Sequence, residues 1–258
     1  MTTHYRPVFF VHIMKTGGTS LKQRISMSFP EPELYPNPAD DENLIQANTE
    51  IDYLRNLSQE RRARTKIYAG HFPYVATEIL GEPVRTMTLL RDPVDRVISH
   101  LKQIRMNKMG WRRFSATLAD IDDPPLEAIY ADEFLKPLFF IDHQVKMFAA
   151  TLADNPASYT KMSVEVDRAR LEIAKANLSR VDCVGILENY DEFVDEASAL
   201  FGLVTNDIPP QRVSSDSRPT DAALRELIAE ENALDIEFYQ FARELCAERS
   251  TQKGLVDD

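Results

Sequence analysis

The chain is poor in cysteine. Its 258 residues include only Cys183 and Cys246, which lie far apart in the sequence. Disulfide frameworks need several cysteines, and structural zinc sites pair Cys or His ligands at short spacing. Neither a C-x-x-C pair nor an H-E-x-x-H motif occurs. We therefore expect reduced thiols and a reaction that uses no metal.

Long apolar runs are also missing. No stretch approaches the roughly 20 residues that a membrane-spanning helix needs. The N-terminal sequence MTTHYRPVFFVHI lacks the basic region and long apolar core of a signal peptide. With 43% apolar and 28% charged residues, the composition is ordinary for a soluble protein. We expect no membrane span and a cytoplasmic location.

Positive charge is in deficit. The 30 Lys and Arg residues face 41 Asp and Glu residues, which gives a formal net charge of −11. This balance disfavours nucleic acid as a partner and opposes a polyanionic acceptor unless a local basic patch overcomes it. One candidate patch is Lys102, Arg105, Lys108, Arg112 and Arg113. The alternative for that patch is a solvated helix face.

The first informative stretch is VFFVHIMKTGGTSLKQRI, residues 8–25. Its apolar start, Val8–Ile13, is typical of a strand buried on both faces of a parallel sheet. Apolar residues then recur at helical spacing over 20–29, so we expect a helix capped by Thr19 or Ser20. The N–H groups at a helix start, with Lys15 beside them, can bind an anion. The alternative is a strand-to-helix turn with no ligand.

The second stretch is VRTMTLLRDPVDRVISHLKQ, residues 84–103. It predicts a strand over 84–90 with Arg91 at its carboxyl end, where ligands collect in open α/β sheets. Asp92 followed by Pro93 is typical of a helix start, as N-cap and first helical residue. Ser99 lies within that helix. The alternative is that Arg91 forms an ion pair with a carboxylate and that Ser99 is an ordinary helix serine.

A Walker A loop is not present. That loop, G-x-x-x-x-G-K-[ST], places lysine after its second glycine, whereas Lys15 precedes both glycines and none lies upstream. No strand ending in acidic residues lies beside the loop in the manner of a Walker B strand. An ordinary nucleoside triphosphatase or small-molecule kinase is therefore disfavoured, although a P-loop-type kinase and a non-catalytic nucleotide-binding protein remain open.

Together the two stretches resemble the sulfotransferases that use 3′-phosphoadenosine 5′-phosphosulfate (PAPS). The first is similar to the family's 5′-phosphosulfate loop, PKTGGTS or PKTGSTS, and the second to its 3′-phosphate motif. The combination of HIxKTGGTS with RDPxxRxxSH looks closest to the carbohydrate branch that includes the heparan uronosyl 2-O-sulfotransferases. The resemblance covers about 40 residues strongly. Met14 and Leu101 depart from it, where the family usually has proline and often tyrosine.

The resemblance implies a role for each matching residue. The 5′-phosphosulfate would lie against Lys15, Thr16, Gly17, Gly18, Thr19 and Ser20. Arg91 and Ser99 would bind the 3′-phosphate. Lys15 and the loop N–H groups would stabilise the charge that builds on the leaving phosphate. Golgi members of the family carry a membrane anchor and this chain shows none, so the resemblance favours a bacterial member.

His71 is the candidate general base. It ends the stretch KIYAGH, residues 66–71, which predicts a short strand and a turn. The carbohydrate branch has a similar strand ending in Gly-His, whose histidine is thought to deprotonate the acceptor hydroxyl. Histidine suits this role because its ordinary pKa lies near neutrality. The alternative is a hydrogen-bonded structural histidine. The general-base role suits His12, His100 and His143 less well, and we expect His12 to be a core residue whose polar atoms are hydrogen-bonded.

Three later segments match the family more weakly. FIDHQVKMFAA, residues 140–150, supplies Gln144 as a possible acceptor contact. VDCVGILENYDEF, residues 181–193, predicts a strand whose end places Glu188 where it could orient Lys15 or the acceptor. PPQRVSSDSRP, residues 209–219, is a possible lid over the cofactor, with Arg218 as its best phosphate contact. The alternatives are structural. Gln144 would lie on a helix surface, Glu188 would cap the following helix, and residues 209–219 would form a linker before the last helix.

Alternation of strands and helices predicts the fold class. Strands near 8–13, 66–70, 84–90 and 181–187 indicate a single α/β domain over 1–258, with a four- or five-stranded parallel sheet flanked by helices. The P-loop-like sulfotransferase fold is what the resemblance implies. We expect residues 111–160 to form a helical insertion on the acceptor side. The expected acceptor is a hydroxyl-bearing carbohydrate or small molecule, and the sequence does not fix which.

Overall fold

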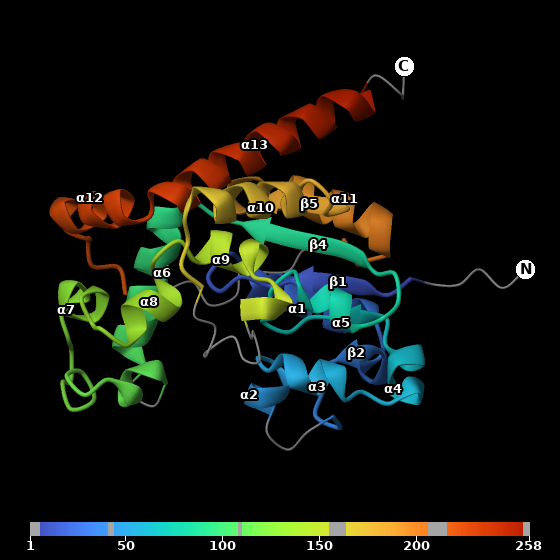
Figure 1. Cartoon of the computed structure of the whole chain (residues 1–258), viewed down its shortest axis with the longest axis horizontal. Helices are drawn as coiled ribbons and strands as arrows, with labels where there is room; N and C mark the ends of the chain where they lie inside the picture. The colour runs from blue at the N-terminus through green and yellow to red at the C-terminus, as the bar shows by residue number, and fades with distance from the viewer. Residues whose placement is uncertain (1–5, 41–43, 108–109, 155–163, 206–215, 255–258) are drawn as a thin grey trace, which may run out of the picture.

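A parallel sheet of five strands forms the centre of the computed structural model (Figure 1). Its order is β2-β3-β1-β4-β5, and the strands are Val8–Val11 (β1), Leu34–Tyr35 (β2), Ile67–Tyr68 (β3), Arg85–Leu90 (β4) and Cys183–Ile186 (β5). The structure describes residues 6–40, 44–107, 110–154, 164–205 and 216–254. The predicted single-domain α/β architecture with an all-parallel sheet is confirmed.

The register of the central strands brings their carboxyl ends to one edge. In β1, Val8 lies opposite Ile67 of β3 on one side and Arg85 of β4 on the other. On the far side of β4, Met87 lies opposite Cys183 of β5. The loops that follow β3, β1, β4 and β5 therefore leave the sheet at the same edge, where ligands bind in open α/β folds.

The sheet is buried on both faces, as the apolar strands predict. Phe9 and Val11 of β1 pack into a core that includes residues of α6, α9, α10 and α13. The alternate residues Val8 and Phe10 face a second core, made with α1 and α11. The period of two along a strand separates these two sets. Both cores support β1 up to the point where the glycine loop begins.

The described helices fall into a longer and a shorter set. The longer ones are α1 (Gly18–Ser28), α6 (Pro93–Met106), α10 (Arg168–Leu178), α11 (Tyr190–Phe201), α12 (Ala222–Glu231) and α13 (Ala233–Gly254), which crosses the top of Figure 1. The shorter ones are α2 (Leu44–Ala47), α3 (Ile51–Arg55), α4 (Gln59–Arg64), α5 (Ala76–Ile79), α7 (Leu126–Tyr130), α8 (Leu135–Phe139) and α9 (His143–Ala149). Single 3₁₀ turns cover Glu31–Glu33, Trp111–Phe114, Leu152–Asp154 and Leu187–Asn189. None of the helices in the described part of the chain has the length and apolar character that crossing a bilayer requires.

Three local predictions are wrong. The sequence of residues 50–64 predicts one helix, but the structure has two, because Ser58 caps α4 by accepting a hydrogen bond from the Arg61 N–H (3.1 Å). The four prolines and many acidic residues of 30–43 predict a surface loop, but this stretch contains β2, which extends the sheet beyond β3. Helix α1 begins at Gly18, so Thr19 and Ser20 lie in its first turn and do not cap it.

Candidate functional site

The loop after β1 has an unusual backbone. Lys15 has a φ of 72° and Gly17 a φ of 87°, both in the left-handed region. Thr16, between them, is fully buried, and its hydroxyl donates to the Ile13 carbonyl oxygen at 3.0 Å. Left-handed residues that alternate with others gather successive N–H groups into concave anion sites. Lysine rarely adopts this conformation, which costs about 1–2 kcal/mol, so the loop geometry is imposed by its surroundings.

Helix α1 starts without a side-chain cap. Gly17 is the N-cap residue, and it has no side chain that could accept a hydrogen bond from the first turn. The first N–H groups of a helix have no intrahelical partner, and the macrodipole makes this end positive. Thr19 and Ser20 lie in that turn, partly exposed. The start of α1 therefore adds to the anion-binding character of the loop.

Close packing explains the second glycine. A Cβ placed on Gly18 would lie 1.8 Å from His12 Nε2. The His12 ring cannot easily move, because it stacks on Phe10 at 4.8 Å and on His71 at 4.0 Å between ring centroids. Only glycine at position 18 lets the helix start approach this histidine pair. The glycine loop and His71 are thus parts of one packed unit.

Arg91 connects the two sequence motifs directly. It follows β4, the neighbour of β1, and its Nη1 donates to the Lys15 carbonyl oxygen at 3.2 Å. Asp92 caps α6 by accepting from the Asp95 N–H at 3.0 Å, and Pro93 is the first helical residue, as predicted. Ser99 lies partly exposed, about two turns into α6. The positively charged loop and the positively charged strand end therefore lie side by side.

His71 lies next to this pair of motifs. Its main-chain N–H donates to the Asn48 carbonyl oxygen at 2.7 Å, and its Nδ1 lies 2.9 Å from the His12 carbonyl oxygen. Because a carbonyl oxygen can only accept, Nδ1 carries the proton and Nε2 holds the lone pair. A histidine fixed in this tautomer can act as a base through Nε2.

The electrostatic surroundings keep His71 neutral. Burial and, to a smaller extent, the charge of Lys22 lower its pKa to about 3, and the hydrogen bond to the His12 carbonyl opposes both effects. Lys22, on α1, donates to Asn48 Oδ1 at 3.0 Å. Neither Lys22 nor Asn48 was predicted. Asn48 reaches the site only because the segment before α3 lies against the end of β3, and the sequence carries no signal for that.

The remaining described histidines surround His71. His12, His100 and His143 are all buried, and burial is the main cause that lowers the pKa of each. His12 is a core residue as expected, but its Nδ1 makes no hydrogen bond within the described residues. His100 packs edge-on against Phe139 at 5.2 Å between ring centroids. Four neutral imidazoles thus line the interior beside the loop.

Gln144 and Glu188 contact the turn after β4. Gln144 is fully buried, and its amide bonds both main-chain polar groups of Arg91. Glu188 is exposed. It accepts from the Asp92 N–H at 3.4 Å and from the Tyr239 hydroxyl at 2.7 Å. Their predicted contacts with the acceptor stay predictions, while in the structure both side chains bind the Arg91–Asp92 turn.

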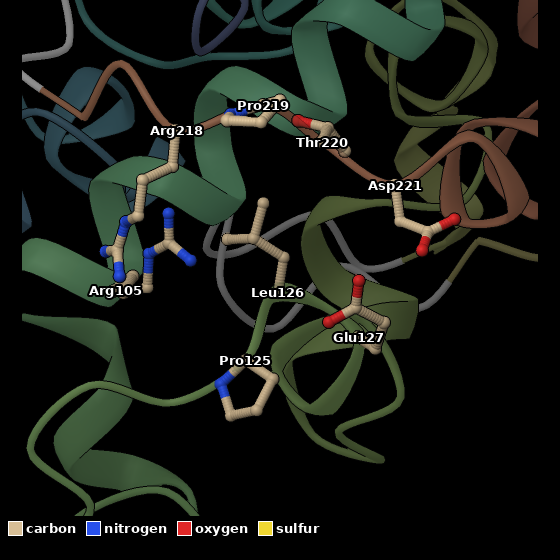
Figure 2. Close-up of a pocket in the computed structure, with 8 residues that line it drawn as sticks. All are labelled: Arg105, Pro125, Leu126, Glu127, Arg218, Pro219, Thr220 and Asp221. Carbon is tan, nitrogen blue, oxygen red and sulfur yellow. The ribbon is translucent and has the colours of Figure 1, made fainter.

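Arg218 belongs to the segment before α12 and lines a cavity of about 480 Å³ (Figure 2). Its guanidinium pairs with Asp123 at 2.6 Å and with Asp216 at 3.0 Å, and these carboxylates raise the pKa of Arg218. Arg105 pairs with Asp216 as well. The cavity lining is Arg105, Pro125, Leu126, Glu127, Arg218, Pro219, Thr220 and Asp221. A phosphate contact by Arg218 would have to compete with two carboxylates.

Two arginines of the basic patch are less solvated than a plain helix face would be, whereas Arg113 is exposed and Lys108 lies outside the described residues. Arg105 is 9% exposed and Arg112 is fully buried, with Arg112 Nη1 donating to the Arg105 carbonyl oxygen at 2.9 Å. Lys102 donates to the carbonyl oxygens of Asp216 and Arg218. These contacts attach the segment before α12 to α6. Most of the predicted lid, including Arg212, Ser214 and Ser215, lies outside the described residues.

Comparison with known proteins adds no family assignment: no family model and no curated protein matches this chain. The function must therefore be argued from the site. In that site an anion-binding loop, an arginine and a neutral histidine with a defined tautomer meet at one sheet edge. Such a set can bind a doubly phosphorylated nucleotide and deprotonate a hydroxyl group.

Proposed function

We propose that this protein is a PAPS-dependent sulfotransferase that acts on the hydroxyl group of a carbohydrate or small-molecule acceptor. The observation that carries the proposal is the contact between the two predicted anion sites. Arg91 Nη1 donates to the Lys15 carbonyl oxygen at 3.2 Å, with His71 packed against the same strand end. A nucleotide with anionic groups at both ends of its ribose suits two adjacent cationic sites.

The residues present fit the 5′-phosphosulfate group. Left-handed backbone at Lys15 and Gly17, and the start of α1 with its glycine N-cap, supply N–H donors. Lys15 adds a full charge, and the Thr16 hydroxyl is committed to the Ile13 carbonyl, where it supports the loop. For the 3′-phosphate, Arg91 uses one N–H on the Lys15 carbonyl, and a guanidinium carries five such donors.

In the proposed reaction the acceptor oxygen attacks sulfur while the bond from sulfur to the 5′-phosphate oxygen breaks. His71 Nε2 takes the acceptor proton, and adenosine 3′,5′-bisphosphate leaves with the electron pair of the broken bond. Lys15 and the loop N–H groups stabilise the charge on the leaving oxygen, and removing one such donor typically costs about 10²–10³-fold in rate. General-base assistance contributes roughly 10²–10⁴-fold.

The low pKa of His71 is compatible with this role. At neutral pH the imidazole is already deprotonated, so Nε2 can accept a proton without a prior ionisation step. The anionic nucleotide would lie close to His71, and a nearby negative charge favours the imidazolium form. Substrate binding should therefore raise the pKa of His71 toward a value that suits a base. A cytoplasmic location is part of the proposal and rests on the sequence alone.

The experiment that tests the assignment pairs two ligands with two proteins. Wild type and Arg91→Ala are titrated calorimetrically with adenosine 3′,5′-bisphosphate and with adenosine 5′-phosphate. If Arg91 binds the 3′-phosphate, the variant loses affinity for the bisphosphate by at least tenfold and for the monophosphate by less than about threefold. Equal losses for both ligands would remove the assigned role of Arg91.

A further inference from the structure

The main chain of Arg91 is held by one side chain. Gln144 Oε1 accepts from the Arg91 N–H at 3.2 Å, and Gln144 Nε2 donates to the Arg91 carbonyl oxygen at 2.9 Å. The amide is fully buried, so water does not replace either bond. An amide that bonds both polar groups of one residue fixes the position and the rotation of that residue's backbone.

The position of Gln144 is fixed in turn by the C-terminal helix. Asp235, near the start of α13, is fully buried and accepts from the N–H groups of Gln144 at 3.1 Å and Val145 at 2.8 Å. The Asp235 N–H donates to Asp142 Oδ1 at 2.9 Å. These reciprocal bonds join the first turn of α9 to α13. Gln144 is therefore a rigid support rather than a mobile surface side chain.

The support continues to the glycine loop. From Gln144 it passes through the Arg91 main chain to the Arg91 guanidinium, which donates to the Lys15 carbonyl oxygen. On the other side of the same turn, the Tyr239 hydroxyl of α13 donates to Glu188, which accepts from the Asp92 N–H. Helix α13 thus braces the Arg91–Asp92 turn from two directions, although none of its residues is part of the loop.

From these contacts we propose that Gln144 is a positioning residue of the nucleotide site. It sets the direction of the Arg91 guanidinium toward the 3′-phosphate and, through the Lys15 carbonyl, supports the left-handed loop. The proposal rests on the function proposed above and adds a residue that acts only through Arg91. It also predicts that Gln144 does not contact the acceptor, in place of the role that the resemblance implied.

A double-mutant cycle separates positioning from general stability. Gln144→Met keeps the volume and removes both hydrogen bonds, and Gln144→Ala serves as a second variant. Affinity for adenosine 3′,5′-bisphosphate is measured by calorimetry in the wild-type and Arg91→Ala backgrounds. We expect Gln144→Met to weaken binding about tenfold with Arg91 present and less than twofold once Arg91 is removed.

Asn177→Ala is the matched control. Asn177 Nδ2 donates to the Phe148 carbonyl oxygen at 2.8 Å, at the other end of α9, so this change also removes an amide-to-backbone bond from the same helix. It should lower the melting temperature without changing bisphosphate affinity. Equal losses in both Arg91 backgrounds, or an equal loss in Asn177→Ala, would overturn the positioning role. A wild-type protein that fails to bind the bisphosphate would instead overturn the proposed function, and this role with it.

Discussion

At the scale of single residues, the site is defined by side chains held in unusual states. Lys15 has a left-handed backbone, and His71 has a pKa far below its ordinary value. Perturbed groups of this kind cluster at functional sites, where the surrounding structure imposes their strain or desolvation. Each state can be tested by a substitution whose effect on stability differs from its effect on function.

Lys15 should show a trade-off between stability and activity. Both Lys15→Ala and Lys15→Gly remove the charge, so we expect each to lower turnover by at least 10²-fold. Only glycine relieves the left-handed backbone, so Lys15→Gly should be more stable than Lys15→Ala by about 1 kcal/mol. Urea unfolding of the two variants measures the difference. Equal stabilities would show that the backbone at position 15 is not strained.

His71 should not titrate near neutrality in the ligand-free protein. Its imidazole signal in NMR spectra, assigned with His71→Asn, is expected to stay constant from pH 8 to pH 5. Because the folded pKa lies below the ordinary value near 6.5, this group stabilises the fold above pH 6.5, and that stabilisation is lost as the pH falls toward 3. Lys22→Met removes a neighbouring charge and should raise the pKa of His71. A titration step near pH 6.5 in the wild-type protein would contradict the account.

A second prediction for His71 concerns its role as the general base. His71→Ala should abolish turnover and leave affinity for adenosine 3′,5′-bisphosphate unchanged, since the imidazole faces the acceptor in the proposed reaction. Calorimetry gives the affinity, and transfer of labelled sulfate to an acceptor panel gives the turnover. A large loss of bisphosphate affinity would make His71 a binding residue instead.

Sequence patterns predicted the charged residues of the site better than their partners. Lys15, the two glycines and Arg91 follow from motifs with fixed spacing, because a loop that binds an anion needs those residue types in that order. The contacts of Gln144 depend on how α9 meets α13, more than 85 positions away in the chain. No local pattern encodes such a meeting, so its partner Asp235 was not predicted.

At the scale of secondary-structure elements, the start of α1 is the critical junction. Gly18→Ala would place its Cβ 1.8 Å from His12 Nε2, inside a stack that also contains Phe10 and His71. Overpacking of this kind costs about 1–3 kcal/mol, which outweighs the gain in helix propensity of at most about 1 kcal/mol. We therefore expect a loss of stability and of turnover. In a His12→Ala background, which removes the ring, the same substitution should cost little.

The junction of α9 and α13 should respond to pH. Burial is the main cause that raises the pKa of Asp235 to about 6, so its contribution to stability is present below pH 4 and is lost as the pH rises through 6. The amide in the Asp235→Asn variant cannot ionise, so the stability of this variant lacks that dependence on pH. Relative to that variant, wild type should lose up to about 3 kcal/mol of unfolding free energy between pH 4 and pH 7. A difference that does not change with pH would show that Asp235 is not desolvated.

Short elements were the hardest to predict. The two-residue strand β2 carries too few residues for an alternating pattern, and it lies between prolines. A longer element, α6, was predicted well, because it begins at Pro93 as expected. Tertiary pairing, which the local sequence does not contain, decides whether a two-residue segment joins a sheet.

At the scale of the whole molecule, parallel strand direction assembles the site. Lys15, His71, Arg91 and Glu188 follow four different strands, and the sheet order places those strands next to one another. The acidic net charge of −11 does not prevent an anion site, because the loop is served by backbone N–H groups as well as by Lys15 and Arg91. We therefore expect local geometry, more than overall charge, to determine which ligand binds in the proposed site.

The central claim is that the sheet edge binds a nucleotide phosphorylated at both the 3′ and 5′ positions. Calorimetric titration of the wild-type protein with adenosine 3′,5′-bisphosphate, and separately with ATP and magnesium, tests it most directly. The account predicts tight binding of the bisphosphate and no response to ATP. Binding of ATP with magnesium but not of the bisphosphate would contradict the account and favour a kinase.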